Sequence, residues 1–479
     1  MAEKGIVGGT YKPLSQVDVE KIHNTSLKVL EEVGVEINGE RALELFQDHG
    51  ANIEGNIVKI PRDMVLENIE KAPSTVRLCG REGKHDLVLE DKKVYVGTGG
   101  TAIYVLNSET GEVRKSKLED IRDTARLVDS LENIHFFMLP LYPHDIPKEN
   151  VDVNRFFTGL KYTSKHVMGG VYTVEGVRDV IRMAEIISGS AEELRKRPII
   201  SMVTLMMSPL KLDREYGKLM MEVASSGIPL VCPTEPLCGS TSPVTLAGNL
   251  VIQNAETLTG VILTQLVNPG TPVICGCVAS TNDLRDMKYL SGSIEMGLLN
   301  AAAAQMAQFY KLPCYVTAGM SDSKITDAQC AYESAMTSLL VALAGGNYIH
   351  DAAGMLEFAL TDCMEKYVID NEILGMVMRA VKGIEVNEET LAFEVIKEVR
   401  PGGNFIANPH TIKHMRREHY LPTLGNRDSR KRWEANGRKD IARRAREKVN
   451  EILRMQNPLA FPEGVEEKIL AEVRGIKNL

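Results

Sequence analysis

The chain has 479 residues and a formal net charge of -8, and 44% of its residues are hydrophobic while 25% are charged. This composition is typical of a globular protein, and the length exceeds that of most single domains. The net negative charge argues against a general nucleic-acid surface, which needs clustered Lys and Arg. No stretch of about 18 uncharged apolar residues suggests a membrane span, and the N-terminus has no apolar signal core. We therefore expect a cytoplasmic protein that binds neither nucleic acid nor a membrane.

The eight cysteines are scattered, and several lie in apolar runs, as expected of reduced, buried thiols rather than of a disulfide framework. There is no HExxH motif, paired CxxC motif or histidine cluster, so we expect no protein-bound zinc or iron. A phosphate-binding P-loop is also absent. The run Gly97-Thr-Gly-Gly100 is a weak glycine signal, which a crowded backbone explains better than a ligand does.

Residues 1–92 are expected to form an N-terminal addition that packs on the outside of the main core. The spacing Ser15-Gln-Val-Asp18 is that of a capping box, in which a hydroxyl and a carboxylate each bond an exposed amide. It predicts a helix that begins at this point. The rest of the region is expected to contain further helices and a short β element.

Residues 93–385 repeat one pattern, in which a short apolar run, a polar loop and an amphipathic helix follow one another. Eight such runs predict a (β/α)₈ barrel with N-terminal and C-terminal helical additions, rather than an open doubly wound sheet. The first unit has an alternative interpretation as a hairpin that turns at Glu109–Gly111. Ser116–Glu119 has the spacing of a second capping box. The expected strands are Val94–Val96, His135–Leu141, His166–Tyr172, Ile199–Leu205, Leu230–Cys232, Pro272–Val278, Leu312–Thr317 and Tyr348–His350.

Residues 386–479 are expected to form a C-terminal helical extension. Its stretch His414–Lys448 is rich in Arg and Lys and contains the only tryptophan, Trp433. A solvated helix with a basic face explains this composition. The alternative is a docking or oligomer surface.

Ligand-handling groups of a barrel are expected at the carboxyl ends of its strands. Glu235 follows the apolar run Leu230–Cys232, and a helix is predicted to begin near Pro243 and Thr245. The Glu235 carboxylate is therefore expected to project into the barrel mouth. A bond to a neighbouring amide or arginine would explain this glutamate equally well.

His350 and Asp351 are adjacent, so in an extended strand they point to opposite faces and at most one of them enters the barrel. His350 has an alternative interpretation as a core histidine bonded to a carbonyl. Aromatic side chains at other strand ends could form a box for a cation, although each one alone also fits barrel packing. These aromatic candidates are Phe137, Tyr142, Tyr172 and Tyr315.

Several segments resemble one known family, in order and along nearly the whole chain. Among them are GTGGTAIYVLNSETGEVR at 97–114, STSPVTLAGNLVIQNAE at 240–256 and AGGNYIHDAAGMLE at 344–357. They look like the trimethylamine methyltransferase family of corrinoid-dependent methyltransferases. The resemblance implies a (β/α)₈ barrel that demethylates a methylamine and passes the methyl group to cobalt in a separate corrinoid protein. This chain itself would then bind no cofactor.

One departure from the family bears on the substrate. The archaeal trimethylamine enzyme carries pyrrolysine, expected near the Ala318–Lys324 loop, whereas this chain consists entirely of standard amino acids. Members without pyrrolysine act on quaternary amines such as glycine betaine, proline betaine and carnitine-like compounds. The resemblance therefore implies a betaine-type substrate, whose methyl group is attacked by Co(I) while a neutral tertiary amine leaves.

Position alone suggests roles for the polar candidates. Glu235 or Asp351 could face the substrate cation, and His350 or Lys324 could hold the substrate carboxylate. Two other functions stay open: a barrel lyase or aldolase that uses Lys324 as a Schiff-base amine, and a non-catalytic protein that binds quaternary amines. The terminal additions could form a homo-oligomer interface or the dock for the corrinoid protein.

Overall fold

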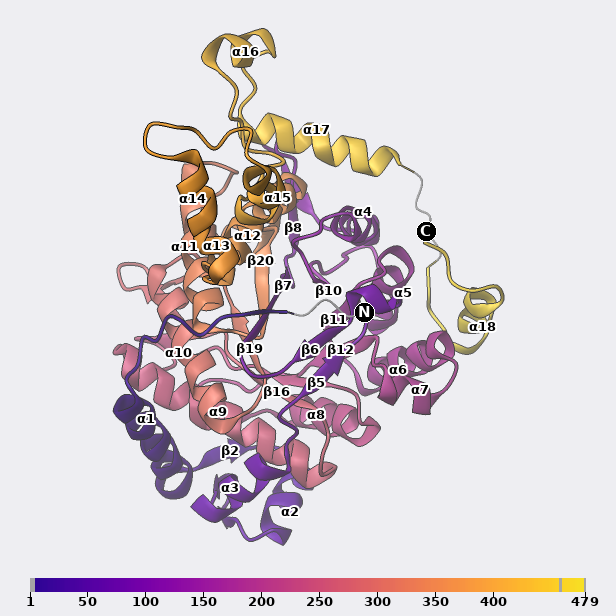
Figure 1. Ribbon diagram of the computed structural model, residues 1–479. Helices are drawn as coiled ribbons and strands as arrows, with labels where there is room; N and C mark the ends of the chain where they lie inside the picture. Colours follow the sequence, from indigo (N-terminus) through magenta and orange to yellow (C-terminus); the bar gives the residue numbers. More distant parts are fainter. Residues whose placement is uncertain (1–4, 456–458, 478–479) are drawn as a thin grey trace.

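A closed barrel of eight parallel strands lies at the centre of the protein, described by a computed structural model over residues 5–455 and 459–477 (Figure 1). Each strand pairs in parallel with the next, and β20 pairs with β7 to close the barrel. The predicted (β/α)₈ barrel is confirmed, with a strand at each of the eight expected places. The strands are β7 (Lys93–Thr98), β10 (Phe136–Met138), β11 (His166–Gly170), β12 (Ile200–Val203), β14 (Leu230–Cys232), β16 (Val273–Gly276), β19 (Cys314–Thr317) and β20 (Tyr348–Ala353).

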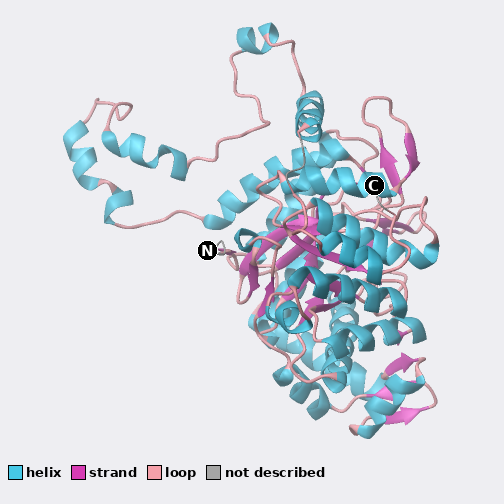
Figure 2. Ribbon diagram, turned by 90° about the vertical axis from the view of Figure 1, so that its right-hand side faces the viewer, coloured by secondary structure: helices cyan, strands magenta, loops and turns pink. Residues whose placement is uncertain are grey.

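Helices follow the strands and surround the barrel (Figures 1 and 2). Helix α9 is long and apolar enough to cross a membrane, but 83% of its apolar stretch is buried within the protein, which is typical of a core helix. It starts after Thr245, whose hydroxyl accepts from the Gly248 amide, as the sequence predicts. The helices of this part are η3 (Lys148–Asn150, 3-10), α4 (Leu118–Asp129), α5 (Val151–Tyr162), α6 (Val174–Ser188), α7 (Ala191–Lys196), α8 (Arg214–Ser226), α9 (Leu246–Val267), α10 (Ile294–Tyr310), α11 (Ala328–Ala344) and α12 (Met364–Lys382).

The start of α4 differs from its prediction by one residue. Lys117 is the N-cap residue, and its amide donates to the Asp120 carboxylate at 2.8 Å. The Ser116 hydroxyl instead donates to the Tyr142 carbonyl at 2.5 Å. A tertiary bond to the loop after β10 thus replaces the local cap that the spacing Ser116–Glu119 implied.

A β-hairpin closes the N-terminal end of the barrel. Its strands, β5 (Val76–Leu78) and β6 (Leu87–Leu89), are antiparallel. Their apolar side chains pack with Tyr95 and Phe136, which belong to the barrel interior. Strand β1 (Ile6–Val7) runs antiparallel beside β7 at the same end. The barrel interior therefore has a packed floor beneath its open mouth.

The N-terminal region packs on the barrel, chiefly through α1 and α3 against α9. The predicted capping box at Ser15 is confirmed, since the Ser15 hydroxyl accepts from the Asp18 amide and the Asp18 carboxylate accepts from the Ser15 amide. The region contains more β structure than expected, because a left-handed turn at Gly55 (φ +64°) lets two short strands pair. Its elements are α1 (Gln16–Lys28), η1 (Val29–Val33, π), β2 (Val35–Ile37), α2 (Glu40–Asp48), β3 (Asn52–Glu54), β4 (Ile57–Lys59), α3 (Arg62–Lys71) and η2 (Gly83–His85, 3-10), and β13 (Lys211–Leu212) joins their sheet.

Two small sheets stand around the carboxyl ends of the barrel strands. The segment from Lys93 onward supplies barrel strand β7 and then the hairpin β8–β9, so both interpretations of the first unit are correct for successive parts of it. A second sheet joins the loop after β14 to a hairpin after β16. The first sheet comprises β8 (Tyr104–Leu106), β9 (Val113–Lys115), β21 (Met355–Leu356) and β22 (Thr361–Asp362), and the second comprises β15 (Leu237–Cys238), β17 (Ser280–Asp283) and β18 (Lys288–Leu290).

The C-terminal helices form two structurally different parts. Helix α17 packs on α12 and α4, and its Arg446 pairs with Glu365 at 3.3 Å, so part of the basic stretch is structural. Residues 384–421, which we call the arm, project away from the barrel (Figure 2). The helices are α13 (Glu388–Leu391), α14 (Phe393–Val399), α15 (Pro409–Glu418), α16 (Arg430–Ala435), α17 (Ile441–Arg454) and α18 (Val465–Glu472).

Candidate active site

Glu235 lies just after β14, in the mouth of the barrel. Solvent reaches its side chain, yet the surrounding protein removes enough hydration to raise its pKa to about 7. The negative charge of Asp351 contributes to this rise, and a hydrogen bond with Tyr289 opposes it. An accessible carboxyl group that titrates near neutrality is characteristic of a functional site.

Asp351 and His350 both face this site, so the expectation that at most one of them enters the barrel is wrong. Asp351 has a left-handed backbone (φ +58°), and the register between β20 and β7 shifts between Ile349 and Ala353. Such an irregularity interrupts the alternation of side chains along a strand. The Asp351 Oδ1 atom accepts from the Gly100 amide at 3.2 Å, which fixes the carboxylate beside β7.

His350 is held by its neighbours on two sides. Its imidazole stacks on the Tyr315 ring, with 3.8 Å between ring centroids and 13° between planes. Its Nε2 atom is hydrogen-bonded to the Thr317 hydroxyl. Its Nδ1 atom lies 3.1 Å from an Asp351 oxygen without hydrogen-bond alignment, and it has no hydrogen-bond partner among the described residues. A buried nitrogen in this state has capacity for a ligand.

Tyr315 forms the part of the floor that supports His350. Its side chain is buried in the barrel interior with Met138 and Tyr348. Burial raises the pKa of the Tyr315 hydroxyl well above its usual value, and this hydroxyl donates to the Met138 sulfur at 3.4 Å. The ring therefore stays neutral and presents its face to the imidazole.

The glycines between β7 and β8 leave room for neighbouring groups. A Cβ atom at Gly97 would lie 2.2 Å from the Phe136 ring. A Cβ atom at Gly99 would lie 2.2 Å from Asp351 Oδ1. The crowding predicted for this glycine run is confirmed, and at Gly99 it concerns the position of the site carboxylate.

A buried ion pair holds the loops that follow β19 and β20. The ammonium of Lys366 lies 2.7 Å from the Asp370 carboxylate, and both side chains are almost fully buried. Lys366 also donates to the Gly319 carbonyl at 3.0 Å, and Asp370 accepts from the Gly354 amide at 2.9 Å. Gly319 follows β19, which carries Tyr315, and Gly354 follows β20, which carries His350 and Asp351, so the pair fixes one wall of the mouth.

Tyr142 and Tyr172 lie together at the rim, with ring centroids 5.7 Å apart. The buried guanidinium of Arg155 lies 5.6 Å from the centre of the Tyr172 ring and donates to its hydroxyl at 3.4 Å. The other N–H groups of Arg155 bond backbone carbonyls and the Thr101 hydroxyl. Because the Tyr172 hydroxyl accepts a hydrogen bond from the Arg155 guanidinium, it can donate its own proton to a ligand.

Two of the candidate residues lie away from the site. Phe137 faces the helices, beside Gly159 of α5, because its neighbours in β10 take the inward positions. Lys324 is exposed in the loop after β19, where its ammonium donates to the Asp322 carbonyl at 2.8 Å and lies 4.2 Å from the Phe358 ring centre. A Schiff-base lysine needs a desolvated position, so the lyase alternative gains no support.

Tyr289 belongs to the site but was missed by the sequence reasoning. It lies on β18 and is hydrogen-bonded to Glu235, and burial raises the pKa of its hydroxyl well above the usual value. A weak signal existed, because the turn-forming residues Asn282, Asp283 and Asp286 precede the apolar pair Tyr289-Leu290. The β17–β18 hairpin lies between β16 and α10, so it is an insertion in the repeat of strand, loop and helix. Sequence reasoning based on eight such repeats does not predict it.

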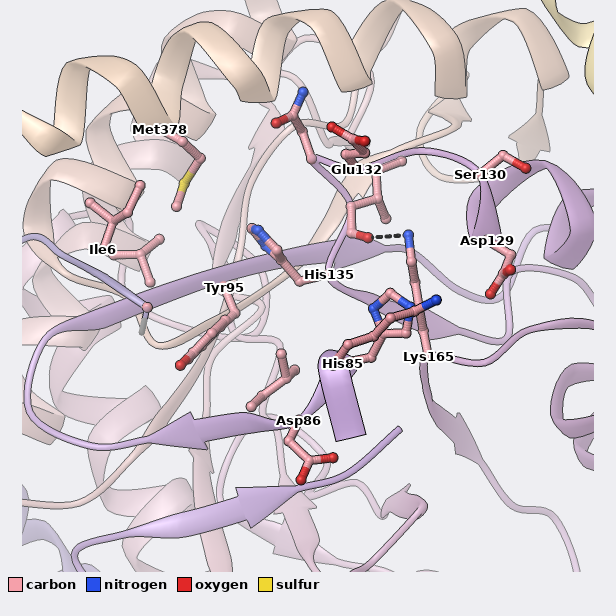
Figure 3. A pocket seen from close by; sticks show the side chains of 16 residues that line it. Ile6, His85, Asp86, Tyr95, Asp129, Ser130, Glu132, His135, Lys165 and Met378 are labelled. Atoms are coloured by element: carbon pink, nitrogen blue, oxygen red, sulfur yellow. Dashed lines mark hydrogen bonds between the residues drawn. The ribbon is translucent and has the colours of Figure 1, made fainter. Parts of the chain in front are cut away.

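A separate cavity of about 760 Å³ lies at the opposite, N-terminal end of the barrel (Figure 3). His85, Asp129 and His135 line it, and burial lowers the pKa of His135 to about 4, so this imidazole is neutral. The Lys165 ammonium donates to carbonyls at the end of α4 and in the loop that follows it, among them that of Ile134 at 2.5 Å. These polar groups serve the packing of the floor, away from the strand ends where barrels bind ligands.

The fold and the site define a (β/α)₈-barrel enzyme whose mouth sets two carboxylates beside aromatic rings and an imidazole. In the described part of the chain, no group of three or more His, Cys, Asp or Glu side chains is arranged to hold a metal ion. The chain belongs to the trimethylamine methyltransferase (MTTB) family, whose model matches residues 4–475. It is therefore a methyltransferase, as the resemblance implied.

Named relatives cover nearly the whole chain. A trimethylamine methyltransferase MttB of Desulfitobacterium hafniense is 38% identical over 96% of this chain and 92% of the relative. A glycine betaine methyltransferase of Desulfitobacterium hafniense is 34% identical over 96% of both chains. A trimethylamine methyltransferase MttB of Methanosarcina barkeri is 39% identical over 91% of this chain and 89% of the relative.

A solved structure supports the fold. The monomethylamine methyltransferase (MtmB) of Methanosarcina barkeri superimposes with a TM-score of 0.50 over 93% of this chain and 96% of its own. The two sequences are 14% identical, so the likeness concerns the barrel architecture.

Proposed function

We propose that this methyltransferase demethylates a quaternary amine of the betaine type, such as glycine betaine, proline betaine or a carnitine-like compound. We further propose that Co(I) of a separate corrinoid protein accepts the methyl group. The observation that carries the proposal is the pair of carboxyl groups, Glu235 and Asp351, at a mouth where Tyr289 lies beside Glu235. The standard amino-acid composition and the relative named glycine betaine methyltransferase support this substrate class.

The two carboxyl groups suit a permanent cation. The negative charge of Asp351 raises the electrostatic cost of ionising Glu235, which contributes to the high pKa of Glu235. A bound quaternary ammonium would relieve this repulsion without a hydrogen bond, since it has no N–H group to offer. The ring face of an aromatic side chain gives the same ion a second favourable surface.

The substrate carboxylate would need donors on another side of the mouth. His350 can supply one, because its Nδ1 atom has no hydrogen-bond partner among the described residues. Tyr172 can supply another, since Arg155 donates to its hydroxyl and leaves the Tyr172 proton available. Lys324, by contrast, is exposed and its ammonium is engaged by Asp322, so we assign it no role in binding.

The chain's own groups suit a reaction that needs no acid. When bound at the mouth, the Co(I) corrinoid supplies the nucleophile that takes the methyl group. The tertiary amine leaves neutral with the electron pair of the broken C–N bond, so no side chain has to deliver a proton. The site residues then act by holding the ammonium, excluding water and directing one methyl group outward.

The rim of the mouth fits an acceptor that another protein carries. Apolar side chains are exposed on loops around the strand ends, and several such side chains at one opening indicate a contact surface. We assign this rim to the corrinoid protein. The exposed side chains include Leu205, Met207, Leu284 and Met287. For the cell compartment we propose the cytoplasm, because all eight cysteines are free and buried, which suits a reducing environment.

A substrate panel tests the proposed function. The purified chain is incubated with glycine betaine, proline betaine, carnitine or trimethylamine together with free Co(I) cobalamin, and methylcobalamin is followed by its absorbance. We expect methylcobalamin from at least one betaine and none from trimethylamine. A response to trimethylamine alone would overturn the substrate class.

Two further outcomes address the remaining parts of the proposal. Betaine binding by calorimetry without any methylcobalamin would favour the non-catalytic alternative. Stoichiometric cobalamin in the purified chain would contradict an acceptor carried by a separate protein.

A further inference from the structure

We propose that Glu256 is a positioning residue for Glu235: it holds the loop after β12 against the end of β14 and thereby fixes where the Glu235 carboxyl group lies in the mouth. The inference rests on the proposed function, in which Glu235 faces the substrate cation. Glu256 lies on α9, and its residue is 0% exposed. Because no solvent reaches Glu256, it acts through the groups that it contacts.

The Glu256 carboxyl group binds the loop after β12, residues 204–211, at two points. Its Oε2 atom accepts from the Ser208 hydroxyl at 2.8 Å, and its Oε1 atom accepts from the Leu210 amide at 2.8 Å. Leu210 has a left-handed backbone (φ +51°), which a bulky residue seldom adopts. The carboxyl group therefore fixes the course of the loop backbone as well as one side chain on it.

The same loop is joined to the end of β14, directly before Glu235. The Met206 amide donates to the Pro233 carbonyl at 3.2 Å, and Met206 forms a parallel β-bridge with Thr234. On the other side, the Thr234 carbonyl accepts from the Val278 amide at 2.9 Å. Glu235 is the next residue in the chain. A displacement of the loop after β12 would therefore move the backbone from which Glu235 projects.

Glu256 is a neutral acid at neutral pH. Burial raises its pKa to about 8, although the Leu210 amide and the Ser208 and Thr234 hydroxyls, which favour the ionised form, oppose the rise. The Thr234 hydroxyl is buried and has no aligned hydrogen-bond partner among the described residues. A protonated carboxyl group can offer a donor as well as acceptors. Glutamine, which is neutral and has both, is therefore the conservative replacement for Glu256, whereas leucine removes both.

Gln265 offers a matched control on the same helix. Its side chain is also fully buried, and it also holds a loop by two bonds. Its Oε1 atom accepts from the Gly270 amide at 2.7 Å, and its Nε2 group donates to the Thr271 carbonyl at 3.0 Å. This loop leads into β16, so it lies at the N-terminal end of the barrel. Gln265→Leu should therefore cost stability, as Glu256→Leu does, without affecting Glu235.

The pKa of Glu235 is the first readout, because a merely structural role of Glu256 would leave it unchanged. It is measured by NMR titration of protein labelled with ¹³C at the glutamate carboxyl carbons, and Glu235→Gln identifies the signal. Burial is the largest cause of the pKa of about 7, and a loosened loop would admit water. In Glu256→Leu the pKa of Glu235 should fall toward its ordinary value, whereas Glu256→Gln and Gln265→Leu should keep it near 7. An unchanged pKa in Glu256→Leu, or an equal fall in Gln265→Leu, overturns the proposal.

Turnover is the second readout. With a betaine and free Co(I) cobalamin, Glu256→Leu should lower kcat/KM about 10- to 100-fold, because a small misplacement of a binding group has an effect of this size. Glu256→Gln and Gln265→Leu should stay within about twofold of wild type. Wild-type kcat/KM in Glu256→Leu overturns the proposal.

Ser208→Ala keeps the test decisive if Glu256→Leu does not fold. It removes one of the two bonds from a partly exposed position, so it should lower kcat/KM about two- to tenfold and the pKa of Glu235 in the same direction. Wild-type values of both quantities in Ser208→Ala would then overturn the proposal. The titration needs no substrate. A chain that demethylates no betaine would therefore contradict the proposed function, while the pKa of Glu235 would still decide this inference.

Discussion

The two ends of the barrel differ in the side chains that the same strands present: apolar side chains are packed at the N-terminal end, and carboxyl groups lie at the mouth. At the N-terminal end, the β5–β6 hairpin packs Leu87 and Leu89 against interior side chains such as Tyr95. At the mouth, the same strands present Glu235 and Asp351, and the negative charge of Asp351 helps to raise the pKa of Glu235. The floor therefore contributes stability, while the mouth keeps uncompensated polar groups that a ligand can satisfy. Substitutions at the two ends should consequently separate stability from activity.

The substitution Lys366→Met should have the largest effect, because it breaks the buried ion pair of the mouth wall. It leaves the Asp370 carboxylate buried without its cation, which costs about 3–5 kcal/mol. The free energy of unfolding is measured by urea denaturation. The double variant Lys366→Met/Asp370→Leu should recover most of this loss. As a control, Lys477→Met breaks an exposed pair with Asp145 and should cost less than about 1 kcal/mol. Equal losses for the two single variants would show that burial is not the cause.

At the floor, Leu89→Ala should lower the free energy of unfolding by about 2–5 kcal/mol through the cavity it leaves. The KM for the amine should stay within about twofold of wild type, because the hairpin does not reach the mouth. Urea denaturation and steady-state kinetics measure the two effects. A changed KM with an unchanged free energy of unfolding would contradict the claim that the floor contributes to stability and not to substrate binding.

At the mouth, Glu235→Gln should lower activity without lowering stability. The loss of a charge facing the bound cation should lower kcat/KM about 10- to 100-fold, equal to about 1.4–2.7 kcal/mol. The stability above neutral pH should not fall, because ionised Glu235 is disfavoured in the folded protein. Methylcobalamin formation and thermal unfolding are the readouts. Wild-type kcat/KM would remove Glu235 from the site.

The protonation state of Glu235 should produce a smaller, pH-dependent effect. Its folded pKa of about 7 lies above the ordinary value, so the group is largely protonated below pH 7 and binds a cation better as the pH rises through 7. A bound cation lowers this pKa, so binding near pH 7 should release a fraction of a proton. Calorimetry in buffers of different ionisation enthalpy measures the release, and Glu235→Gln should abolish it. Proton uptake on binding would reverse the assigned sign.

The same pKa shift has a definite sign for stability. A carboxyl group whose pKa is raised on folding holds its proton longer in the folded state than in the unfolded state. Its contribution is therefore most favourable below the unfolded pKa, and it is lost as the pH rises through about 7. Glu235→Gln should flatten this part of the pH profile of stability.

Regular repetition made the barrel predictable, and local irregularity hid parts of the site. Each apolar run, such as Leu230–Cys232, fits only a strand buried on both faces, and eight of them determine a closed sheet. Asp351 has a left-handed backbone and packs closely against Gly99, and no spacing in the sequence reveals either feature. Tyr289 contacts Glu235 from a hairpin that is not part of the βα repeat. Phe137 points toward the helices, because successive side chains of β10 alternate between the barrel interior and the helices.

The packed hairpin beneath the barrel has a kinetic consequence. Because the hairpin packs the N-terminal end of the barrel, the substrate enters and the product leaves through the mouth. Under the proposed function, the corrinoid protein covers this mouth during methyl transfer. The amine would then enter before its partner and depart after it, in a compulsory order. Excess partner should accordingly slow turnover at limiting amine, whereas free cobalamin, which is smaller, should do so less. Turnover that rises steadily with partner concentration would indicate a second exit.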